Sequence, residues 1–499
     1  MDGEYTRRQR AGLLAGPAAA AAVLFLLRPD GIEPAAARVA AVAVLMAVWW
    51  ITEAIPLAAT ALLPVVLFPA FGVMETSRAA APYANHLIFL FLGGFLIAVT
   101  MERWDLHRRV AVVTIRLVGA GPGRILLGFM LATAFLSMWI SNTATALMMV
   151  PIGTAVIRHT ESCSPLPGPR RDAAASPGAF GTALMLGIAY SASIGGVATL
   201  IGTPPNVILA GFIEERWGRT ISFASWMAFG VPLAATMLLL AWLFLRHRFI
   251  RDVRELPGGM ECIDEEERKL GPVSRAEKRT AAVFLLVAAG WIARGVFEHE
   301  SLSMITDSTI AVGGAVLLFL IPSGSGSGRF LLDWRTASKI PWEVIILFGG
   351  GLSLAGGFRL TGLDLWIGQW ISVLQGVHYA VLTAGIVLLT IFLTEITSNT
   401  ATSAMLIPVV AGIAVTMSIH PFGPLVAACV AASYAFMLPV ATPPNAVVFS
   451  SRRVTIAQMA GAGIALNIAG WLMITIFVTL ILPMLWRIDL SSVPGWIAR

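Results

Sequence analysis

Two runs of small polar side chains stand out because they interrupt long apolar stretches. SNTAT occupies residues 141–145 and recurs unchanged at residues 398–402, while TPPN occupies residues 203–206 and recurs at residues 442–445. Hydroxyls, side-chain amides and free backbone carbonyls can coordinate a hard monovalent cation, and hydroxyls and amides also hydrogen-bond carboxylates. These runs therefore indicate either polar contacts between packed helices or a binding site for a polar solute.

The composition places both runs in a membrane. Of the 499 residues, 57% are hydrophobic and only 12% are charged, against roughly 25% charged in an average soluble domain. Apolar windows long enough to span a bilayer recur from residue 11 to residue 486. The first window continues into LRPD at residues 27–30 instead of ending at a small-residue cleavage site, so it is interpreted as a membrane helix.

Charge and cysteine usage exclude other classes of protein. The net charge of +6 gives no reason to expect a nucleic-acid partner, because the Lys and Arg residues lie in short loops where they set membrane orientation. Cys163, Cys262 and Cys429 are too far apart to predict a disulfide framework or a metal site.

The basic loops predict the orientation of the chain in the membrane. The loop at 248–279 is the longest and is rich in Arg and Lys, which predicts a cytoplasmic location. The acidic segment 297–307 is then external. Counting spans from these loops puts the N-terminus in the cytoplasm and the C-terminus outside, in a cell's inner (plasma) membrane.

The predicted fold is an all-α polytopic membrane protein with about eleven transmembrane helices and two segments that enter the membrane and turn back. The expected spans are 11–27, 37–54, 55–73, 86–101, 180–216, 226–246, 280–297, 309–322, 343–360, 423–450 and 458–486. The re-entrant segments are 125–157 and 382–414.

The chain divides into two similar halves. The SNTAT runs are 257 residues apart (398 − 141), and Gly93 and Pro151 match Gly350 and Pro408 at the same offset. The TPPN runs are 239 apart (442 − 203), because only the first half carries the polar insert 160–181. Five crossings, an odd number, separate equivalent points, so the repeats are inverted, which is typical of transporters.

This repeat predicts the domain organisation of the chain. Its parts are a tail with the first helix (1–36), a first repeat (37–247), a charged loop (248–279), a second repeat (280–487) and an external tail (488–499).

The uncharged stretch between Arg124 and Arg158 is too long for one simple span. Its 33 residues (158 − 124 − 1) would form a helix of about 50 Å at ~1.5 Å per residue, against a hydrocarbon core of about 30 Å. Two half-spanning helices that turn near Ser141, or near Ser398 in the second half, fit both length and polarity. The paired prolines of TPPN should break the helices 180–216 and 423–450. Such backbone is allowed at this depth only inside protein or beside a wet cavity.

The polar runs contain no basic side chain. No Lys or Arg occurs within 125–157, 182–213, 382–414 or 423–451. An anion at this place would depend on amides, hydroxyls, the positive ends of helices and a co-bound cation. Because an uncompensated dianion in a low-dielectric site is very costly, Na+ ions behind the tips would offset its charge. No organic cofactor is expected.

Four segments in order resemble a known family. FLSMWISNTAT, IGTPPN, TEITSNTAT and FMLPVATPPN are similar to motifs of the divalent anion:sodium symporter family, of the bacterial dicarboxylate type, and the likeness covers most of residues 37–486. The resemblance implies a homodimer built on scaffold domains and an elevator-type movement of a transport domain.

The resemblance also implies the residues of the site. Those for the dianionic substrate are Ser141, Asn142, Thr143, Ser398, Asn399 and Thr400, with Thr203 and Thr442 close by. Those for the first Na+ are Ser137, Ser141, Asn142 and Gly202, and those for the second are Thr394, Thr397, Asn399 and Ala441. The repeat supports this set independently, because Ser137 and Thr394 each precede SNT by four residues.

The leading hypothesis is secondary active symport of Na+ with a C4 dicarboxylate such as succinate, malate or fumarate. The alternatives are a Na+-independent dicarboxylate or anion exchanger and a sulfate or citrate symporter. A channel or a membrane-embedded enzyme is more remote, because the polar core offers Glu395 but no nucleophile–base pair. Glu395 could couple ion movement or pair with a dipole at the edge of the site, and both interpretations stay open.

Overall fold

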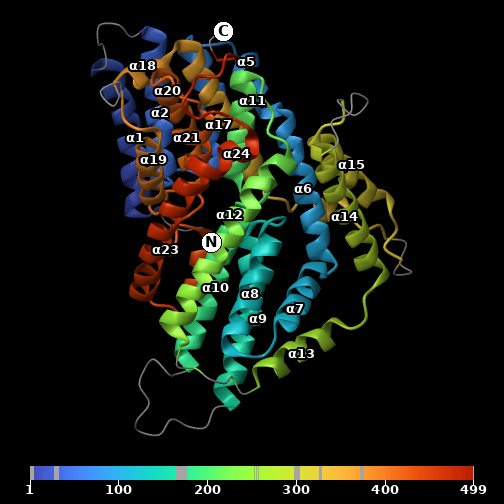
Figure 1. The fold of residues 1–499 in the computed structure, drawn as a ribbon. Coiled ribbons are helices and arrows are strands. Elements are labelled where there is room, and N and C mark those ends of the chain that lie inside the picture. The colour runs from blue at the N-terminus through green and yellow to red at the C-terminus, as the bar shows by residue number, and fades with distance from the viewer. Residues whose placement is uncertain are drawn as a thin grey trace.

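The computed structural model shows a helical molecule with no β-strand among the residues it describes (Figure 1). The described residues are 5–26, 33–163, 177–251, 253, 256, 258–296, 304–324, 329–370 and 376–497. Most of the insert 160–181, the acidic segment at 297–303 and a few residues of the loop 248–279 lie outside this part of the chain.

Seven helices in the described part are long and apolar enough to cross a membrane. Several further apolar helices have only 10–17 residues, among them Pro122–Ser137, Tyr379–Thr394 and Phe422–Ala431. Pro122–Ser137 and Tyr379–Thr394 each form one arm of a hairpin. Asn399–Thr416, an arm of the second hairpin, and Gly178–Gly196, half of the first broken helix, are instead among the seven long helices. The membrane class and the all-α fold are therefore confirmed, while the number of about eleven crossings stays a prediction.

The chain begins with helices that lie outside the two hairpins. They are α1 (Arg7–Leu26), α2 (Pro34–Thr52), α3 (Leu57–Ala61), α4 (Leu63–Ala70), α5 (Thr76–Ala80), a 3-10 turn (Ala81–Ala84), α6 (His86–Arg103) and α7 (Leu106–Val118). The expected single span 55–73 consists of two short helices, with Pro64 in the first turn of α4, where a missing N–H is tolerated. α7 lies between the expected span 86–101 and the expected re-entrant segment 125–157, where no membrane segment is predicted.

The first hairpin follows directly. Its arms are α8 (Pro122–Ser137) and α9 (Asn142–Cys163), and the broken helix after it consists of α10 (Pro177–Gly196) and α11 (Pro204–Trp217). The long α12 (Phe223–Phe249) completes this half. The prolines of TPPN occupy the first turn of α11, with Thr203 extended before them. The predicted re-entrant turn and helix break are both present.

Four further helices follow α12. They are α13 (Gly259–Leu270), α14 (Arg275–Val296), α15 (Asp307–Leu320) and α16 (Trp334–Ala337). Among them, most of α14 and all of α15 fall within the predicted second repeat. α13 lies within the predicted charged loop and packs on α7 and α9. Its acidic side chains pair with arginines of α7, as Glu266 does with Arg108 at 3.2 Å.

The rest of the second half repeats the pattern of the first hairpin and its broken helix. Its elements are α17 (Trp342–Thr361), α18 (Leu363–Trp370), α19 (Tyr379–Thr394), α20 (Asn399–Thr416), α21 (Phe422–Ala431), α22 (Pro443–Ser450), α23 (Ile456–Ile476), a π-helical turn (Phe477–Ile481) and α24 (Leu482–Trp486). α19 and α20 form the second hairpin, and the break between α21 and α22 again ends at TPPN.

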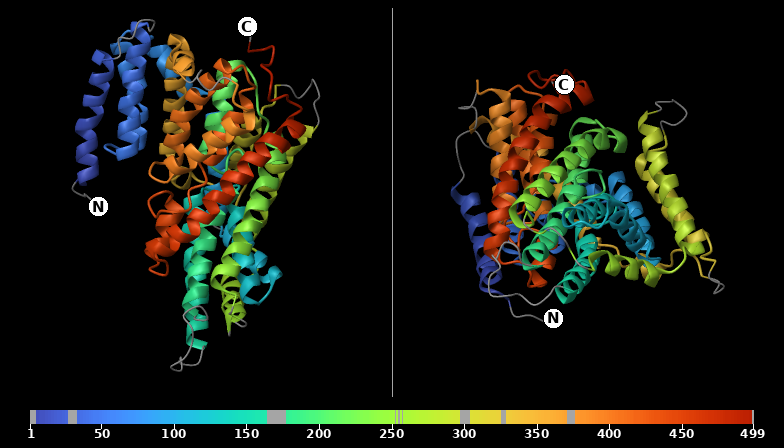
Figure 2. Two further views of the ribbon diagram at one scale, coloured as in Figure 1. Left: turned by 60° about the vertical axis from the view of Figure 1, so that its left-hand side comes forward. Right: turned by 60° about the horizontal axis from the view of Figure 1, so that its bottom comes forward.

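The two hairpins enter from opposite ends of the molecule, α8–α9 from the end that carries α13 and α19–α20 from the end that carries the C-terminus (Figure 1). The halves interlock, because α22 packs on α9 and α10 while α11 packs on α20 and α21. We call α8–α12 and α19–α24 the hairpin helices. We call the remaining helices the outer helices. Among them, α1 lies on one side of the hairpin helices and α14–α15 lie on the other (Figure 2).

Candidate binding site at the two hairpin tips

Tip 1 (residues 138–141) joins α8 to α9 and brings part of the first predicted cation set together. The Ser137 hydroxyl donates to the carbonyl of Ala192 (2.7 Å) and lies 2.5 Å from the side-chain amide of Asn142. The same amide position is 3.1 Å from the Ala192 oxygen and 3.2 Å from the Gly202 oxygen. The Asn142 amide can take two orientations. If Nδ2 occupies this position, it donates to both carbonyls. If Oδ1 occupies it, this oxygen meets the Ser137 hydroxyl and the two carbonyl oxygens, so that four oxygens converge.

Close backbone approach makes this cluster possible. A Cβ on Gly196 would lie 2.6 Å from the Asn142 amide, and a Cβ on Gly202 would lie 2.4 Å from the Gly196 carbonyl oxygen. Ser141, Asn142 and Thr143 are half-buried, whereas Thr203 is buried. The Ser141 hydroxyl accepts from the Ala144 N–H (3.2 Å) and so caps α9.

Tip 2 (residues 395–398) repeats part of this arrangement. The Thr394 hydroxyl lies 2.8 Å from Asn399 Oδ1 and donates to the carbonyl of Ala432 (2.8 Å). Thr394 and Asn399 are thus brought together as Ser137 and Asn142 are. Thr397 turns elsewhere, since its hydroxyl donates to the Leu393 carbonyl (2.9 Å).

The remaining predicted residues lie around tip 2. Ser398 and Thr400 are half-buried beside Asn399, while Ala441 and Thr442 are buried at the start of α22. The Thr442 hydroxyl accepts from the Asn445 N–H at 3.3 Å.

Two asparagines that the sequence reasoning did not assign hold the helix breaks open. Asn206 donates through Nδ2 to the carbonyls of Gly196 (3.2 Å) and Thr199 (2.7 Å). Asn445 donates in the same way to Ala435 (3.1 Å) and Leu438 (3.0 Å), two carbonyls shifted by the same 239 residues. Carbonyls freed at a break must be satisfied inside the membrane. The signal was present, because Asn ends both TPPN runs.

Glu395 lies at tip 2 and is buried. Its carboxylate accepts hydrogen bonds from the N–H groups of Phe436 (2.8 Å), Met437 (2.9 Å) and Leu438 (3.1 Å) and from Nδ2 of Asn467 (2.7 Å). These donors belong to the break between α21 and α22 and to α23. The geometry matches the dipole-pairing interpretation of Glu395.

At tip 1 the corresponding support is aromatic. The Trp139 indole stacks on that of Trp291 in α14, with ring centroids 6.4 Å apart and planes 3° apart, and meets Phe284 edge-on at 5.0 Å. Phe223, at the start of α12, stacks on Trp291 at 4.3 Å. Tip 1 is therefore packed against an outer helix.

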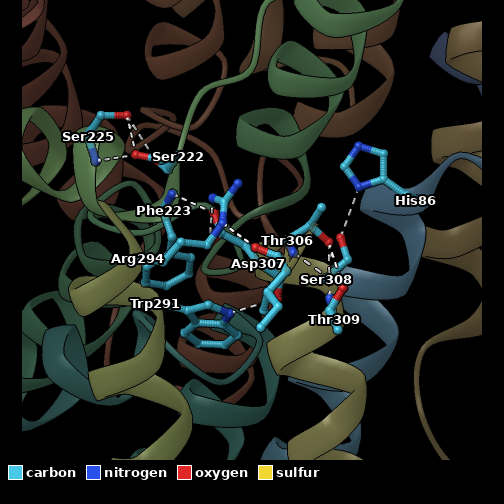
Figure 3. A network of polar contacts seen from close by, with 11 residues as sticks. His86, Ser222, Phe223, Ser225, Trp291, Arg294, Thr306, Asp307, Ser308 and Thr309 are labelled. Carbon is cyan, nitrogen blue, oxygen red and sulfur yellow. Dashed lines mark hydrogen bonds and ion pairs between the residues drawn. The ribbon is translucent and has the colours of Figure 1, made fainter. Parts of the chain in front are cut away.

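A polar network fixes Trp291 in turn (Figure 3). Its indole N–H donates to the carbonyl of Asp307 (2.9 Å), and the Asp307 carboxylate accepts from the Phe223 N–H (2.9 Å) and pairs with Arg294 (3.1 Å). His86 of α6 lies 3.2 Å from the Ser308 hydroxyl. The network ties α6, α12, α14 and α15 together behind the aromatic stack.

A cavity of about 390 Å³ lies beside tip 1, between the junction of α6 with α7 and the start of α9. Glu102, Asp105 and His107 line one side, and Ile140, Ala144 and Thr145 line the other. At tip 2, Arg8 of α1 donates to the carbonyl of Ile396 (3.1 Å). A basic side chain from outside the polar runs therefore reaches this tip.

Known proteins share both sequence and fold with this chain. The family described as "Sodium:sulfate symporter transmembrane region" matches residues 8–488. The sodium-dependent dicarboxylate transporter SdcS of Staphylococcus saprophyticus is 43% identical over 492 residues, covering 98% of this chain and 94% of that protein. SdcS of Staphylococcus aureus strain MRSA252 is 41% identical over the same coverage.

Two solved structures are similar in fold alone. The MtrF structure from Neisseria gonorrhoeae has a TM-score of 0.59 at 14% identity and covers 92% of this chain and 98% of its own. The YdaH transporter of Alcanivorax borkumensis has a TM-score of 0.55 at 15% identity, with 89% and 98% covered. The family match and the SdcS identities confirm what the four segments indicated: the chain belongs to the divalent anion:sodium symporter family of membrane transporters.

Proposed function

We propose that this protein is a secondary active symporter that couples Na+ to the uptake of C4 dicarboxylates such as succinate, malate and fumarate. The observation that carries the proposal is the duplicated cluster of neutral oxygens behind each tip, centred on Asn142 and on Asn399. Relatives named as sodium-dependent dicarboxylate transporters support the same conclusion.

Each of these asparagines belongs to two environments. Asn142 begins α9 and Asn399 begins α20, so both stand at helix N-termini, whose partial positive charge favours a carboxylate. Each side chain also lies in an oxygen cluster suited to Na+. A cation in the first cluster would turn Oδ1 of Asn142 inward and leave Nδ2 free to donate to substrate. Binding of the ion and of the dianion would then favour each other.

The same proposal assigns the remaining site residues. Ser141, Thr143, Ser398 and Thr400 would meet the carboxylates, with Thr203 and Thr442 behind them. Ser137, Ser141, Asn142 and Gly202 would hold the first Na+, and Thr394, Thr397, Asn399 and Ala441 the second. Because Thr397 donates to Leu393 in this structure, its backbone carbonyl is the more accessible ligand.

We propose an elevator-type movement in which the hairpin helices slide along the outer helices. Arg8, part of the basic N-terminus, contacts tip 2, and the cavity beside tip 1 opens next to α7. Both observations support a position of the tips toward the end that carries α13. With α13 and the N-terminus cytoplasmic and the C-terminus external, this is the inward-facing state.

The domain boundaries and assembly are part of this proposal. The two repeats at 37–247 and 280–487 would each contribute one hairpin to the transport domain. The outer helices would form the scaffold of a homodimer in the inner membrane, surrounded by lipid.

Uptake into proteoliposomes tests the function. Labelled succinate should accumulate only with an inward Na+ gradient, and unlabelled malate and fumarate should compete, with sulfate and citrate as separate competitors. Uptake that needs internal dicarboxylate but no Na+ would overturn symport in favour of exchange.

An exchanger is the second candidate because Arg8 supplies a positive charge at tip 2 without a cation. Arg8→Gln distinguishes the two functions. Under symport the variant keeps its Na+ dependence, because Arg8 donates to the backbone carbonyl of Ile396, whereas the oxygen cluster of tip 2 consists of Thr394, Asn399 and the Ala432 carbonyl. Loss of substrate binding in this variant, at saturating Na+, would favour the exchanger.

A further inference from the structure

A second concave site lies far from the tips, where α8 begins and α12 ends. It is a cavity of about 860 Å³ whose walls come from the turn between α7 and α8, the first turn of α8 and the last turns of α12. Cavities of roughly 300–1,000 Å³ are typical of small-molecule sites. The hairpin tips do not take part in it.

Basic residues converge on this cavity from three places. Arg124 comes from α8, Arg246 and His247 come from α12, and Arg251 follows α12. Arg124 and Arg246 flank one glycine-rich turn: a Cβ on Gly119 would lie 3.4 Å from Cδ of Arg124, and a Cβ on Gly123 would lie 3.4 Å from Nε of Arg246.

These arginines lack ion pairs within the described part of the chain, and no described acidic residue lines the cavity. The contrast with α7 is direct. Arg108, Arg109 and Arg116 on that helix pair with Glu266, Glu277 and Glu267. The arginines of α7 are therefore neutralised by acidic partners, whereas the positive charge of the arginines at this cavity has no described acidic partner.

The other wall of the cavity is apolar and continues onto the lipid-facing surface. Leu127, Trp242 and Leu243 line it, and Leu239 and Leu243 are 51% and 45% exposed on one face of α12, a candidate membrane span. Trp242 donates to the carbonyl of Gly123 (2.9 Å), and the Arg246 guanidinium lies 5.3 Å from its ring centroid. Among the described residues, no Ser, Thr, Asn or Gln lines the cavity, which disfavours a small soluble anion that needs many neutral donors.

We propose that this cavity binds the headgroup of an anionic phospholipid, with its acyl chains along Leu239 and Leu243. Basic pockets between membrane helices, beside an apolar wall and an interfacial Trp, fit the phosphate and chains of such a lipid. The first turn of α8 adds free N–H groups and the positive end of its dipole. The bound lipid would contact the turn that connects α7 to the first hairpin.

Native mass spectrometry of the purified protein in detergent tests this site without any transport measurement. The added probes are phosphatidylglycerol, phosphatidylcholine with the same chains, and inorganic phosphate. The full-length protein should retain phosphatidylglycerol in preference to phosphatidylcholine, and inorganic phosphate should not displace it. At about 1 kcal/mol per basic residue, affinity should fall roughly fivefold in Arg246→Gln and about a hundredfold in Arg124→Gln/Arg246→Gln/Arg251→Gln.

Arg248→Gln is the matched control. Arg248 is exposed on the same helix and does not line the cavity, so the variant should bind phosphatidylglycerol as the unmodified protein does. Three results would each overturn the proposal: undiminished binding in the triple variant, equal retention of both lipids, or displacement by inorganic phosphate, which would indicate a soluble-anion site. If the triple variant is poorly folded, Arg246→Gln alone decides.

Discussion

The two hairpin tips share a backbone arrangement but are supported by different chemistry. In tip 1, Met138 and Trp139 occupy the positions that Glu395 and Ile396 occupy in tip 2, at the offset of 257. Trp139 is 8% exposed within an aromatic stack, whereas Ile396 is 54% exposed. Glu395 satisfies three backbone N–H groups directly, whereas at tip 1 the Thr199 hydroxyl donates to the backbone carbonyl of Met138 at 2.5 Å.

The proposed ligand-binding residues of the two tips are therefore alike, whereas the contacts that support each tip differ. The Ser/Thr–Asn pair behind each tip is duplicated, as a shared ligand chemistry requires. The supporting contacts are not duplicated. Tip 1 packs against α14, an outer helix, whereas tip 2 is hydrogen-bonded to the α21–α22 break and to α23, which belong to the hairpin helices. If the hairpin helices move, tip 1 must leave Phe284 and Trp291 of α14 but keeps Phe223 of α12, whereas tip 2 keeps its polar partners.

The largest expected effect tests what the tips share. Asn142→Ala and Asn399→Ala should each abolish Na+-driven succinate uptake in proteoliposomes, because each removes an amide that serves both the oxygen cluster and the helix N-terminus. Size-exclusion profiles and expression should stay close to those of the unmodified protein. Normal uptake by either variant would show that the binding chemistry is not duplicated.

The next effect tests the support of tip 1. Trp139→Ala should lower the free energy of unfolding by about 3–5 kcal/mol, the usual cost of deleting a large buried aromatic side chain. Thermal unfolding in detergent measures this loss. Ile396→Ala, the equivalent change in tip 2, should have a far smaller effect because that side chain is largely exposed. Equal losses would contradict the asymmetry.

A pH effect on stability is expected in the second half, at the turn between α20 and α21. His420 is 4% exposed there, and burial lowers its pKa from 6.5 to about 4 although Asp489 acts in the opposite direction. The folded protein favours the neutral ring, so its stabilisation is complete above pH 6.5 and is lost as the pH falls toward 4. The loss amounts to about 3 kcal/mol.

His420→Gln isolates this contribution, because it removes the titrating ring. The variant should lose less thermal stability than the unmodified protein between pH 7 and pH 4.5. Parallel losses across that range would show that protonation of His420 does not contribute.

The smallest effect tests the support of tip 2. Glu395→Gln replaces a charged acceptor of four donors by an amide with one oxygen, which should cost about 1–3 kcal/mol of stability. Met138→Leu at the equivalent position of tip 1 is the control and should cost less than about 1.5 kcal/mol. If Glu395→Gln is as stable as the control but loses Na+ dependence, the coupling interpretation of Glu395 gains support instead.

The sequence predicted the parts of the fold that have a strong local signal. The uncharged runs, the repeated SNT and the paired prolines indicated both hairpins and both helix breaks, and the structure contains all four. Ser137 with Asn142, and Thr394 with Asn399, meet as the repeat implied. The roles of the site residues toward substrate and ion stay predictions.

Other features depended on contacts that no local pattern contains. The charges of α13 favour a loop in the sequence, although its apolar residues Met260, Ile263 and Leu270 follow helical spacing. Trp139 was not assigned because its partners Phe284 and Trp291 lie about 150 residues away in the sequence. The role of Glu395 stayed open because its donors are backbone N–H groups, which every residue except proline has.

The glycines beside Asn142 set a dimension of the first oxygen cluster. Because a side chain at position 196 or 202 would collide with an amide or a carbonyl, the spacing of these oxygens is fixed by how closely two backbones touch. A change of side-chain rotamer therefore cannot widen this spacing. To accommodate a larger ion such as K+, the break between α10 and α11 would have to shift as a unit. Discrimination by ionic radius would then be a property of the main chain.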